Sequence, residues 1–155
     1  GWQEAYRGIM PDQFLDTIEP APRLAMWTGC IAAPESMCFA AYDSGAPIGV
    51  ALATPAGRSA GLGADGEVVA IYILRSHCGR GLGRSLMGHC ARKWISRGGT
   101  SFAVRVLEAN LPARRFYERI GGVPGPSPGD FRIGDLVLPE VSYLFDDLNP
   151  ISAGA

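Results

Sequence analysis

The fold is decided by residues 67–84, whose sequence is Glu67-Val-Val-Ala-Ile-Tyr-Ile-Leu-Arg-Ser-His-Cys-Gly-Arg-Gly-Leu-Gly-Arg84. The apolar, β-branched part, Val68 to Leu74, is typical of a buried strand. Gly79, Gly81 and Gly83 then alternate with larger residues directly before a helical pattern. The first turn of a helix has N–H groups without an intrahelical partner, and glycines let a phosphate reach them because no Cβ stands in the way. The stretch therefore predicts a strand, an anion-binding loop and a helix, and with them a cofactor that carries phosphate.

Two common phosphate loops do not fit this spacing. A Walker loop would need lysine at position 84 and glycine at position 78, where the chain has Arg84 and Cys78. A dinucleotide fingerprint that starts at Gly79 would need glycine or alanine at position 84. The glycines alone agree equally well with a tight turn that binds nothing, and a nucleotide-binding domain with a degenerate loop stays an alternative.

A second motif lies one expected helix and one expected strand further on, Asn110-Leu-Pro-Ala-Arg-Arg-Phe-Tyr-Glu-Arg-Ile-Gly121. It is similar to the Asn-x-x-Ala-x-x-Phe-Tyr-x-x-x-Gly-Phe helix of the GCN5-related N-acetyltransferases (GNAT), with Gly122 in place of the final Phe. The glycine loop resembles the acetyl-CoA pyrophosphate loop of the same family, whose Gly-x-Gly matches Gly81 to Gly83. Cys78 replaces the Gln or Arg that opens the family's loop. The resemblance covers about residues 2–148.

The resemblance implies an α/β (α+β) fold, the acyl-CoA N-acyltransferase fold, with a mixed, mostly antiparallel central sheet flanked by helices. We expect one N-acetyltransferase domain over residues 1–148 and a frayed tail over residues 149–155. Family members usually begin with a strand and most of a helix, whereas residues 1–6 resemble the end of that helix. The first strand is therefore expected to be missing from this chain.

The resemblance also implies acetyl-CoA as cosubstrate, with no metal. In the family, backbone amides of the glycine loop bind the pyrophosphate, and a backbone N–H of the preceding strand polarises the thioester oxygen. Asn110 should contact the cofactor, although an asparagine before Leu-Pro is equally suited to capping a helix. The implied cofactor-binding residues are Ile71, Tyr72, Ile73, Gly79, Arg80, Gly81, Leu82, Gly83, Arg84 and Asn110.

Acetyl transfer to an amine needs a base for the amine and an acid for the departing thiolate. The residue that matches the family's acid is Tyr117, and its pKa of about 10 in isolation is comparable with that of a thiol. Glu67, at the start of the central strand, matches the family's base, although such a position is more often simply solvated. Further carboxylates that could serve are Glu108, Asp135 and Glu140.

Composition excludes several other classes of protein. The 155 residues are 47% hydrophobic and 19% charged, as expected of a globular chain. A net charge of −1 gives no basic face for nucleic acid. No apolar run approaches 18 residues, so no membrane span is expected. The four cysteines form neither a zinc pattern nor a disulfide framework, which makes a reducing cytoplasm the default location.

The remaining pattern predicts the rest of the fold. We expect short helices from Pro11 to Ile18 and from Pro22 to Cys30. A hairpin should follow, and residues 55–66, with four glycines, should form a mobile surface connection. The expected strands are 37–42, 47–54, 68–74, 101–107, 131–136 and 140–145, the expected further helices are 82–95 and 111–120, and the expected loop is 123–129.

Together these observations predict an N-acetyltransferase that moves acetyl from acetyl-CoA to a primary amine by direct attack in a ternary complex. Family members that acetylate protein N-termini often have a Glu where this chain has Arg105, which favours a small-molecule acceptor over a protein or peptide amine. A covalent mechanism through Cys78 is disfavoured because no His and acid pair can be placed beside it. A non-catalytic acyl-CoA-binding sensor or partner module is the other alternative. Homodimers are common in the family.

Overall fold

The computed structural model describes residues 6–17 and 19–154. In chain order its elements are α2 (Asp12–Thr17), α3 (Pro20–Ala32), β1 (Met37–Asp43), β2 (Ala46–Pro55), β3 (Gly66–Ile73), the 3₁₀ helix η1 (Arg75–His77), α4 (Leu82–Ile95), β4 (Phe102–Leu107), α5 (Leu111–Arg119), β5 (Val123–Pro124), β6 (Asp130–Ile133), β7 (Leu136–Phe145) and α6 (Asn149–Ser152).

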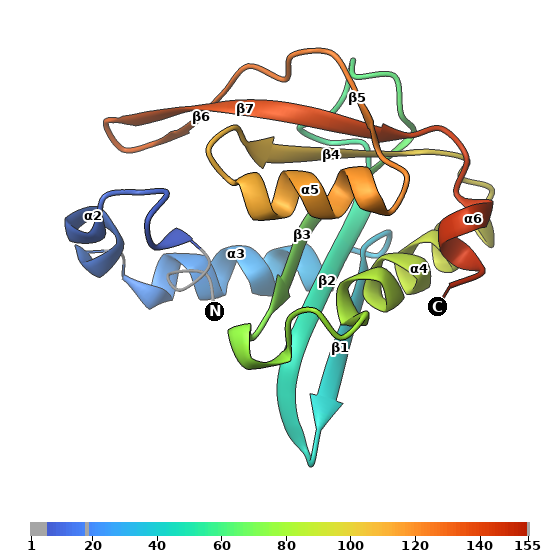
Figure 1. Ribbon diagram of the computed structural model, residues 1–155, viewed down its shortest axis with the longest axis horizontal. Helices are drawn as coiled ribbons and strands as arrows, with labels where there is room; N and C mark the ends of the chain where they lie inside the picture. Colours follow the sequence, from blue (N-terminus) through green and yellow to red (C-terminus); the bar gives the residue numbers. More distant parts are fainter. Residues whose placement is uncertain (1–5, 18, 155) are drawn as a thin grey trace.

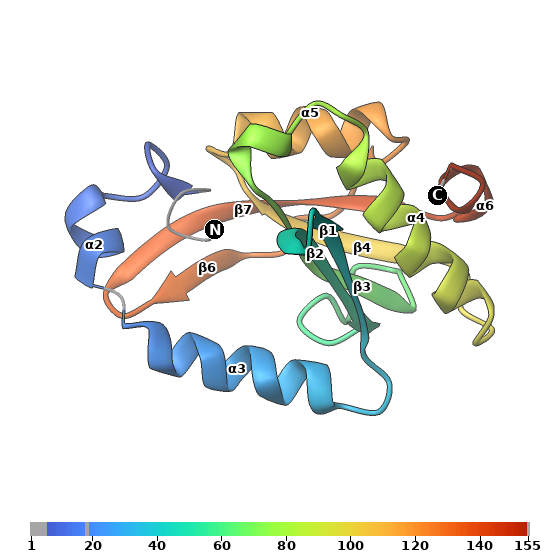
Figure 2. The same ribbon diagram turned by 90° about the horizontal axis from the view of Figure 1, so that it is seen from below.

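The strands form one sheet in the order β1-β2-β3-β4-β7-β5, and β6 pairs with β7 outside this path. Neighbouring strands are antiparallel except β3 and β4, which are parallel. Helices α4 and α5 cover one face of the sheet and α3 lies on the other (Figures 1 and 2). The predicted mixed, mostly antiparallel sheet flanked by helices is confirmed.

Strand β3 contains a bulge. Leu52 of β2 pairs with Ala70, whereas the next residue, Ala53, pairs with Val68, so that Val69 is an extra residue on β3. An extra residue reverses the alternation of side chains along a strand, because successive residues otherwise point to opposite faces. The sequence pattern predicted the strand but not this reversal of the faces to which its side chains point.

The bulge decides which side chains of β3 face which helices. Val68, Ile71 and Ile73 pack in the main core. Glu67 and Tyr72 instead line a cavity on the α3 side. They lie five residues apart, and without the bulge they would point to opposite faces.

Strands β3 and β4 are paired only at their beginnings. The parallel pairing runs from Gly66, opposite Phe102, to Val68, opposite Val104, and ends there. Beyond Val68, the backbone of β3 has β2 on one side and, among the described residues, no strand on the other. The two strands therefore separate, and the edge of β3 that faces the gap has no strand partner within the described ranges.

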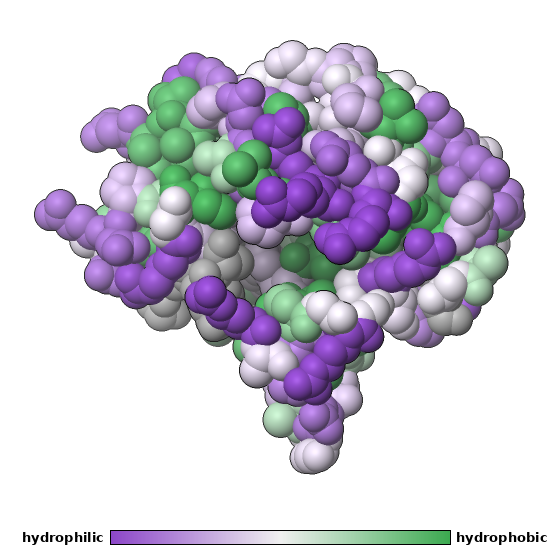
Figure 3. Space-filling model, viewed as in Figure 1, coloured by the Kyte–Doolittle hydropathy of each residue, from purple (hydrophilic) through white to green (hydrophobic). Residues whose placement is uncertain are grey.

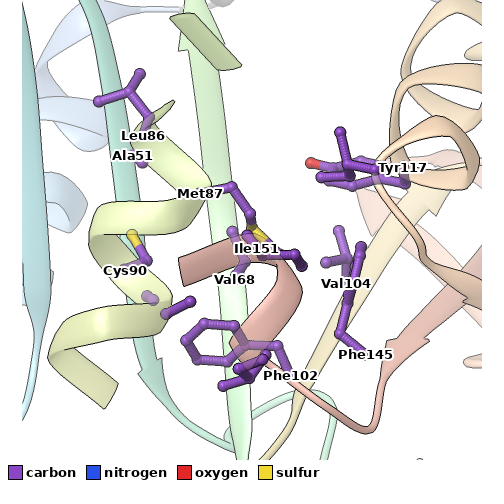
Figure 4. Packing of buried hydrophobic residues seen from close by; sticks show 14 of the residues in the cluster. Ala51, Val68, Leu86, Met87, Cys90, Phe102, Val104, Tyr117, Phe145 and Ile151 are labelled. Atoms are coloured by element: carbon purple, nitrogen blue, oxygen red, sulfur yellow. The ribbon is translucent and has the colours of Figure 1, made fainter. Parts of the chain in front are cut away.

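The main core lies between the sheet and helices α4 and α5. The apolar stripe predicted for α4 is buried, with Leu86 at 3% exposure and Met87 and Cys90 at 0%. Figure 4 shows Met87 extending from α4 toward Val68 of β3, with Phe102 of β4 below, and Leu86 lying near Ala51 of β2. The core fixes α4, and with it the glycine loop, against the central strand.

Asp65 ties the start of β3 to the start of β4. Its carboxylate accepts hydrogen bonds from Trp94 Nε1 at 2.9 Å, from Ser101 N at 3.0 Å and from Thr100 N at 2.8 Å. Partial burial alone would raise the pKa of Asp65, but these donors outweigh it and hold the pKa well below its usual range. The charged carboxylate therefore stabilises the junction from which the two strands separate.

The expected frayed tail is wrong. Residues 149–152 form the short helix α6, and Leu148 and Ile151 are 1% and 2% exposed. The helix packs on α4, whose Arg92 donates from Nη1 to Ser152 O at 3.2 Å. The polar and small residues of the tail obscured two apolar side chains that complete the core.

Three further expectations need correction. The surface connection expected over residues 55–66 is mostly exposed but shorter, because Pro55 ends β2 and Gly66 begins β3, and two of its side chains are buried, Ser59 at 0% and Leu62 at 8% exposure. Residues 123–129 include the two-residue strand β5, which pairs with Leu144 and Tyr143 of β7. The final hairpin turns at Gly134, so β7 starts at residue 136 instead of 140.

The expected helix end falls mostly on residues 1–5, which lie outside the described residues, and the expectation of a missing first strand concerns that same region. In the described part of the chain, β1 occupies one edge of the sheet. No helix in the described ranges is long and apolar enough to span a membrane.

Candidate active site

The glycine loop ends in the exposed first turn of α4. Gly79 and Gly81 have φ angles of 76° and 82°, in the left-handed region that favours glycine, and Gly81 is the N-cap. Ser85 N bonds to Gly81 O at 3.0 Å, which closes the first helical turn. The N–H groups before it, those of Leu82, Gly83 and Arg84, therefore have no acceptor within the helix.

Gly83 brings α4 unusually close to α5. A Cβ at Gly83 would lie 3.0 Å from the Phe116 ring and 3.3 Å from Ile73 Cδ1. Glycine at this position therefore lets the helix that follows the loop pack against the second motif. The two motifs that were recognised separately in the sequence form one surface.

Between the loop and α5 lies a cavity of about 530 Å³, here called the glycine-loop cavity. Figure 3 shows the surface hollowed beneath the hydrophilic side chains of α5, with hydrophobic residues inside the hollow. Of the predicted cofactor-binding residues, only Arg80 does not line it. The cavity is lined by Ile71, Tyr72, Ile73, His77, Cys78, Gly79, Gly81, Leu82, Gly83, Arg84, Asn110, Pro112, Ala113, Phe116, Tyr117, Arg119 and Ile120.

Asn110 both caps α5 and lines this cavity. Its Oδ1 accepts a hydrogen bond from Ala113 N at 3.2 Å, as an N-cap residue does. The capping interaction that the sequence allowed is therefore present, and it fixes the side chain at the cavity wall. The two roles considered for Asn110 are compatible.

Tyr117 of α5 lines the glycine-loop cavity. Its ring is stacked on Tyr143, with 6.0 Å between the centroids, and it is 7% exposed. In Figure 4 it extends from α5 over the core. Burial, with a smaller contribution from Tyr6, raises the pKa of Tyr117 above its ordinary value. The phenol is therefore protonated at neutral pH.

Gly122 departs from the family motif, and the structure explains why. A Cβ at this position would lie 2.7 Å from Phe145 Cζ and 2.9 Å from Tyr117 O. The ring of Phe145 thus occupies the space into which a larger residue at position 122 would project. The apolar volume that the motif supplies from α5 comes here from β7.

A second cavity of about 330 Å³ lies on the opposite face of β3, beside α3, and is here called the α3 cavity. Of the residues that the structure describes, Tyr72 is the one that lines both cavities. The α3 cavity is lined by Tyr6, Met10, Met26, Trp27, Cys30, Leu52, Arg58, Glu67, Val68, Val69, Ala70, Tyr72, Arg105, Leu107, Phe131, Arg132, Ile133 and Glu140.

Glu67 is buried in the wall of the α3 cavity. The residue is 4% exposed, and its Oε2 accepts a hydrogen bond from Ser59 N at 2.9 Å. The segment that the sequence suggested was a surface loop therefore covers this carboxylate. Glu67 and Tyr117 lie on different cavities, on opposite faces of the sheet.

Glu140 also lines the α3 cavity, but it is held by two arginines. Its Oε2 accepts from Arg105 Nη2 at 2.6 Å, from Arg105 Nε at 2.9 Å and from Arg58 Nη2 at 3.4 Å. The side chains of Arg105 and Glu140 are 11% and 6% exposed. The two other carboxylates suggested as bases, Glu108 and Asp135, are exposed and do not line this cavity.

Cys78 and His77 do not form a catalytic pair. Cys78 is exposed, and its Sγ lies 3.6 Å from Leu74 O. The ring of His77 contacts Ser76 through Nδ1 at 2.9 Å and Asp43 through Nε2 at 3.3 Å. Neither ring nitrogen is directed to the Cys78 thiol.

The sequence and the fold match known acetyltransferases. A sequence model of the acetyltransferase (GNAT) family matches residues 2–122. The chain belongs to this family. It is 28% identical over 150 residues to the uncharacterized N-acetyltransferase YuaI of Bacillus subtilis (strain 168), covering 97% of this chain and 84% of YuaI.

Two solved acetyltransferases share the fold. PaiA N-acetyltransferase from Thermoplasma acidophilum, in complex with coenzyme A, superposes with a TM-score of 0.71 at 13% identity, over 94% of this chain and 85% of PaiA. YncA from Salmonella typhimurium, with acetyl-CoA, superposes with a TM-score of 0.65 at 17% identity, over 96% of this chain and 87% of YncA. As a GNAT member, the chain is an acetyl-CoA-dependent N-acetyltransferase.

Two aromatic residues of the α3 cavity were not predicted from the sequence. Trp27 and Phe131 lie on the α3 cavity, but each is a single aromatic residue in an otherwise ordinary segment. Their convergence depends on tertiary packing and leaves no local signal. The pairing of Arg105 with Glu140 is different, because both residues had been singled out and only their contact was missing.

Proposed function

We propose that this acetyltransferase transfers acetyl from acetyl-CoA to the primary amine of a small molecule, by direct attack while both substrates are bound. One observation supports the proposal most strongly. Two cavities lie on opposite faces of β3, and they adjoin at Tyr72, beyond the point at which β3 separates from β4. A donor in the glycine-loop cavity and an acceptor in the α3 cavity could meet through that gap.

The glycine-loop cavity has the features that acetyl-CoA requires. The unpaired N–H groups at the start of α4 suit a pyrophosphate, and Gly79 and Gly81 leave open space around their backbone. Acetyl-CoA supplies a thioester carbonyl that an amine can attack. On the edge of β3 that faces the gap, the backbone N–H groups of Ile71 and Ile73 are placed to stabilise the charge that develops on the carbonyl oxygen, because Leu74 N donates to Ile48 O on the β2 side and successive N–H groups alternate between the two edges.

Glu67 is the proposed base. A primary amine is protonated at neutral pH and must lose a proton before its nitrogen can form the new C–N bond. Glu67 lines the α3 cavity, and the described residues donate only one hydrogen bond to its carboxylate, from Ser59. Glu140, in contrast, is already engaged by Arg105 and Arg58. Glu67 therefore has the carboxylate with fewer donors among the described residues, and it can contact an acceptor amine directly or through water.

Tyr117 is the proposed acid. As the C–S bond breaks, the electron pair stays on sulfur, and the sulfur must receive a proton. Tyr117 is protonated, lines the glycine-loop cavity and lies on the side opposite Glu67. Burial that raises the pKa of the phenol would also raise that of a thiolate in the same environment, which keeps the two comparable.

The size of the α3 cavity supports a small acceptor over a protein. A volume of about 330 Å³ is at the lower end of the range for small-molecule sites. A sensor that binds acyl-CoA without turnover would need no second cavity with a buried carboxylate.

The first experiment is a thermal-unfolding titration with acetyl-CoA, CoA and ATP in parallel, followed by a thiol-release assay with a panel of amines. A ligand at 100 times its Kd stabilises the fold by about 2.7 kcal/mol, a shift of roughly 5–10 °C at this size. We expect shifts with acetyl-CoA and CoA, none with ATP, and intersecting initial-rate plots. Parallel plots would indicate a covalent intermediate, and a shift without turnover of any amine would favour the sensor.

Glu67→Gln tests the base. It keeps the acceptor of the Ser59 hydrogen bond and removes the proton-accepting charge, so the rate should fall while the thermal shift with CoA is retained. An unchanged rate would assign the base elsewhere.

A further inference from the structure

We propose that the acceptor is an arylalkylamine: a primary amine joined by a short aliphatic link to a flat aromatic body, with no carboxylate beside the amino group. This inference rests on the proposed function and concerns the chemistry of the α3 cavity. Three properties of that cavity support the inference: its aromatic walls, a buried carboxylate without an ion-pair partner among the described residues, and its size.

The aromatic walls come from three elements. Trp27 of α3 and Tyr72 of β3 meet edge to face, with 6.1 Å between their ring centroids. Phe131 of β6 lines the same cavity, and the guanidinium of Arg58 lies over its ring at 5.7 Å from the centroid. Aromatic rings prefer such edge-to-face and offset arrangements with other rings. A planar acceptor would gain more from these walls than a flexible aliphatic chain.

Cationic groups of the cavity are already paired. Arg105 uses Nε and Nη2 for Glu140 and Nη1 for Arg58 O, at 3.0 Å. Arg58 contacts Glu140 from a side chain that is 57% exposed, and the 69%-exposed Arg132 contacts Asp130. These two lie at the rim, where water screens their charge.

The buried charged group of the cavity that has no ion-pair partner among the described residues is therefore a carboxylate, Glu67. Glu67 is buried and has no arginine among its described partners. An incoming ammonium would compensate this carboxylate before it gives up its proton. A carboxylate next to the amino group would instead be brought close to Glu67 and Glu140, with no free inner guanidinium to receive it. Amines without that carboxylate are thus favoured over amino acids.

The size of the cavity excludes bulky polyamines. About 330 Å³ suits one ring system and a short arm. A multi-ring aminoglycoside carries several ammonium groups, and the described lining offers one uncommitted buried carboxylate for them. A single amine on a compact aromatic body satisfies volume, charge and wall chemistry together.

The test compares matched amines in the thiol-release assay at saturating acetyl-CoA. Tryptamine and tryptophan share a ring system and differ by the α-carboxylate, as do 2-phenylethylamine and phenylalanine. Spermidine, kanamycin and an alanine-initiated peptide represent the other acceptor classes. We expect kcat/KM for each arylalkylamine to exceed that of its matched amino acid and of the other three at least tenfold.

Two substitutions on α3 test the binding mode. Trp27→Ala should raise KM for tryptamine about tenfold or more, with little change in kcat, because it removes an aromatic wall and not a reacting group. Leu24→Ala is the matched control: Leu24 is on the same helix, is 69% exposed and does not line the cavity. It should leave KM unchanged. A merely structural effect of Trp27→Ala would lower kcat and the unfolding midpoint instead.

The outcomes separate this inference from the proposed function. Faster turnover of an amino acid, spermidine, kanamycin or the peptide than of the arylalkylamines would overturn the inference and leave the acetyltransferase proposal intact. Equal KM values for Trp27→Ala and the unchanged protein would also overturn it. If no amine is turned over, the inference fails, and the thermal shift with acetyl-CoA decides whether donor binding fails with it.

Discussion

Tyr117→Phe separates chemistry from stability because the hydroxyl that it removes has no structural partner among the described residues. Only burial and Tyr6 shift the pKa of the phenol, and the variant keeps the contact between the rings of residues 117 and 143. We therefore expect a change in unfolding free energy of less than about 1 kcal/mol. Loss of a general acid should lower kcat by about 10²- to 10⁴-fold, or roughly 2.7–5.4 kcal/mol of barrier.

Tyr143→Phe is the matched control, since the two rings are stacked and only one hydroxyl faces the cavity. The Tyr143 hydroxyl donates to Glu118 Oε1 at 2.7 Å and accepts from Arg114 Nε at 3.3 Å. Its removal should cost about 1–3 kcal/mol of stability and leave kcat nearly unchanged.

The assay combines thiol-release kinetics, CoA affinity by calorimetry and thermal unfolding for both variants. The two variants should behave in opposite ways. Tyr117→Phe should have a lower kcat with unchanged CoA affinity and unfolding midpoint, and Tyr143→Phe should have a lower unfolding midpoint with unchanged kcat. If Tyr117→Phe retains full kcat, or if both variants lose rate equally, the assignment of Tyr117 as the acid is refuted.

Three further predictions concern stability. Asp65→Asn should lower the free energy of unfolding by about 1–2 kcal/mol at neutral pH, a figure reduced by the exposure of this carboxylate. Because the pKa of Asp65 is lowered in the folded state, the difference in stability from the unchanged protein should shrink as pH falls below about 4. Urea titrations at pH 7 and pH 3 would check this. Gly122→Ala should cost about 1–3 kcal/mol because its Cβ would overlap the Phe145 ring, and an unchanged midpoint would show that the ring can move aside. Ile151→Ala should lower the free energy of unfolding by about 2–5 kcal/mol, because Ile151 is buried in the core. A loss below about 1 kcal/mol in urea unfolding would show that the C-terminal residues are frayed.

The parts of the fold that follow local rules were predictable from the sequence. A β-branched run, glycines before a helix and an apolar stripe with a 3.6-residue period gave β3, the loop and α4 close to their observed bounds. The proposed cofactor side of the site follows from the same signals, because its proposed binding groups are backbone amides whose geometry glycines reveal. Nine of the ten predicted residues line the glycine-loop cavity, all but Arg80.

What escaped prediction depends on contacts between distant segments. The bulge at Val69 exists only in the pairing of β3 with β2, and the burial of Glu67 depends on the segment that holds Ser59. Ile151 looked like part of a polar tail because its partners lie on α4, about 60 residues earlier in the chain. The proposed acceptor side of the site combines α3, β3, β6 and β7. The sequence pointed to Glu67, Arg105 and Glu140 but neither to their position around one cavity nor to the aromatic residues Trp27 and Phe131.

The sharing of a single residue, Tyr72, between the two cavities has a consequence for how such an enzyme can diversify. The wall of the glycine-loop cavity comes from residues 71–84 and 110–120, whereas most of the α3 cavity comes from segments outside those ranges. Substitutions on α3 or β6, apart from Trp27, which packs against Tyr72, would therefore leave the proposed donor site unchanged. A laboratory library confined to the cavity-facing positions of α3 and β6 would explore new acceptors while the proposed donor site stays constant.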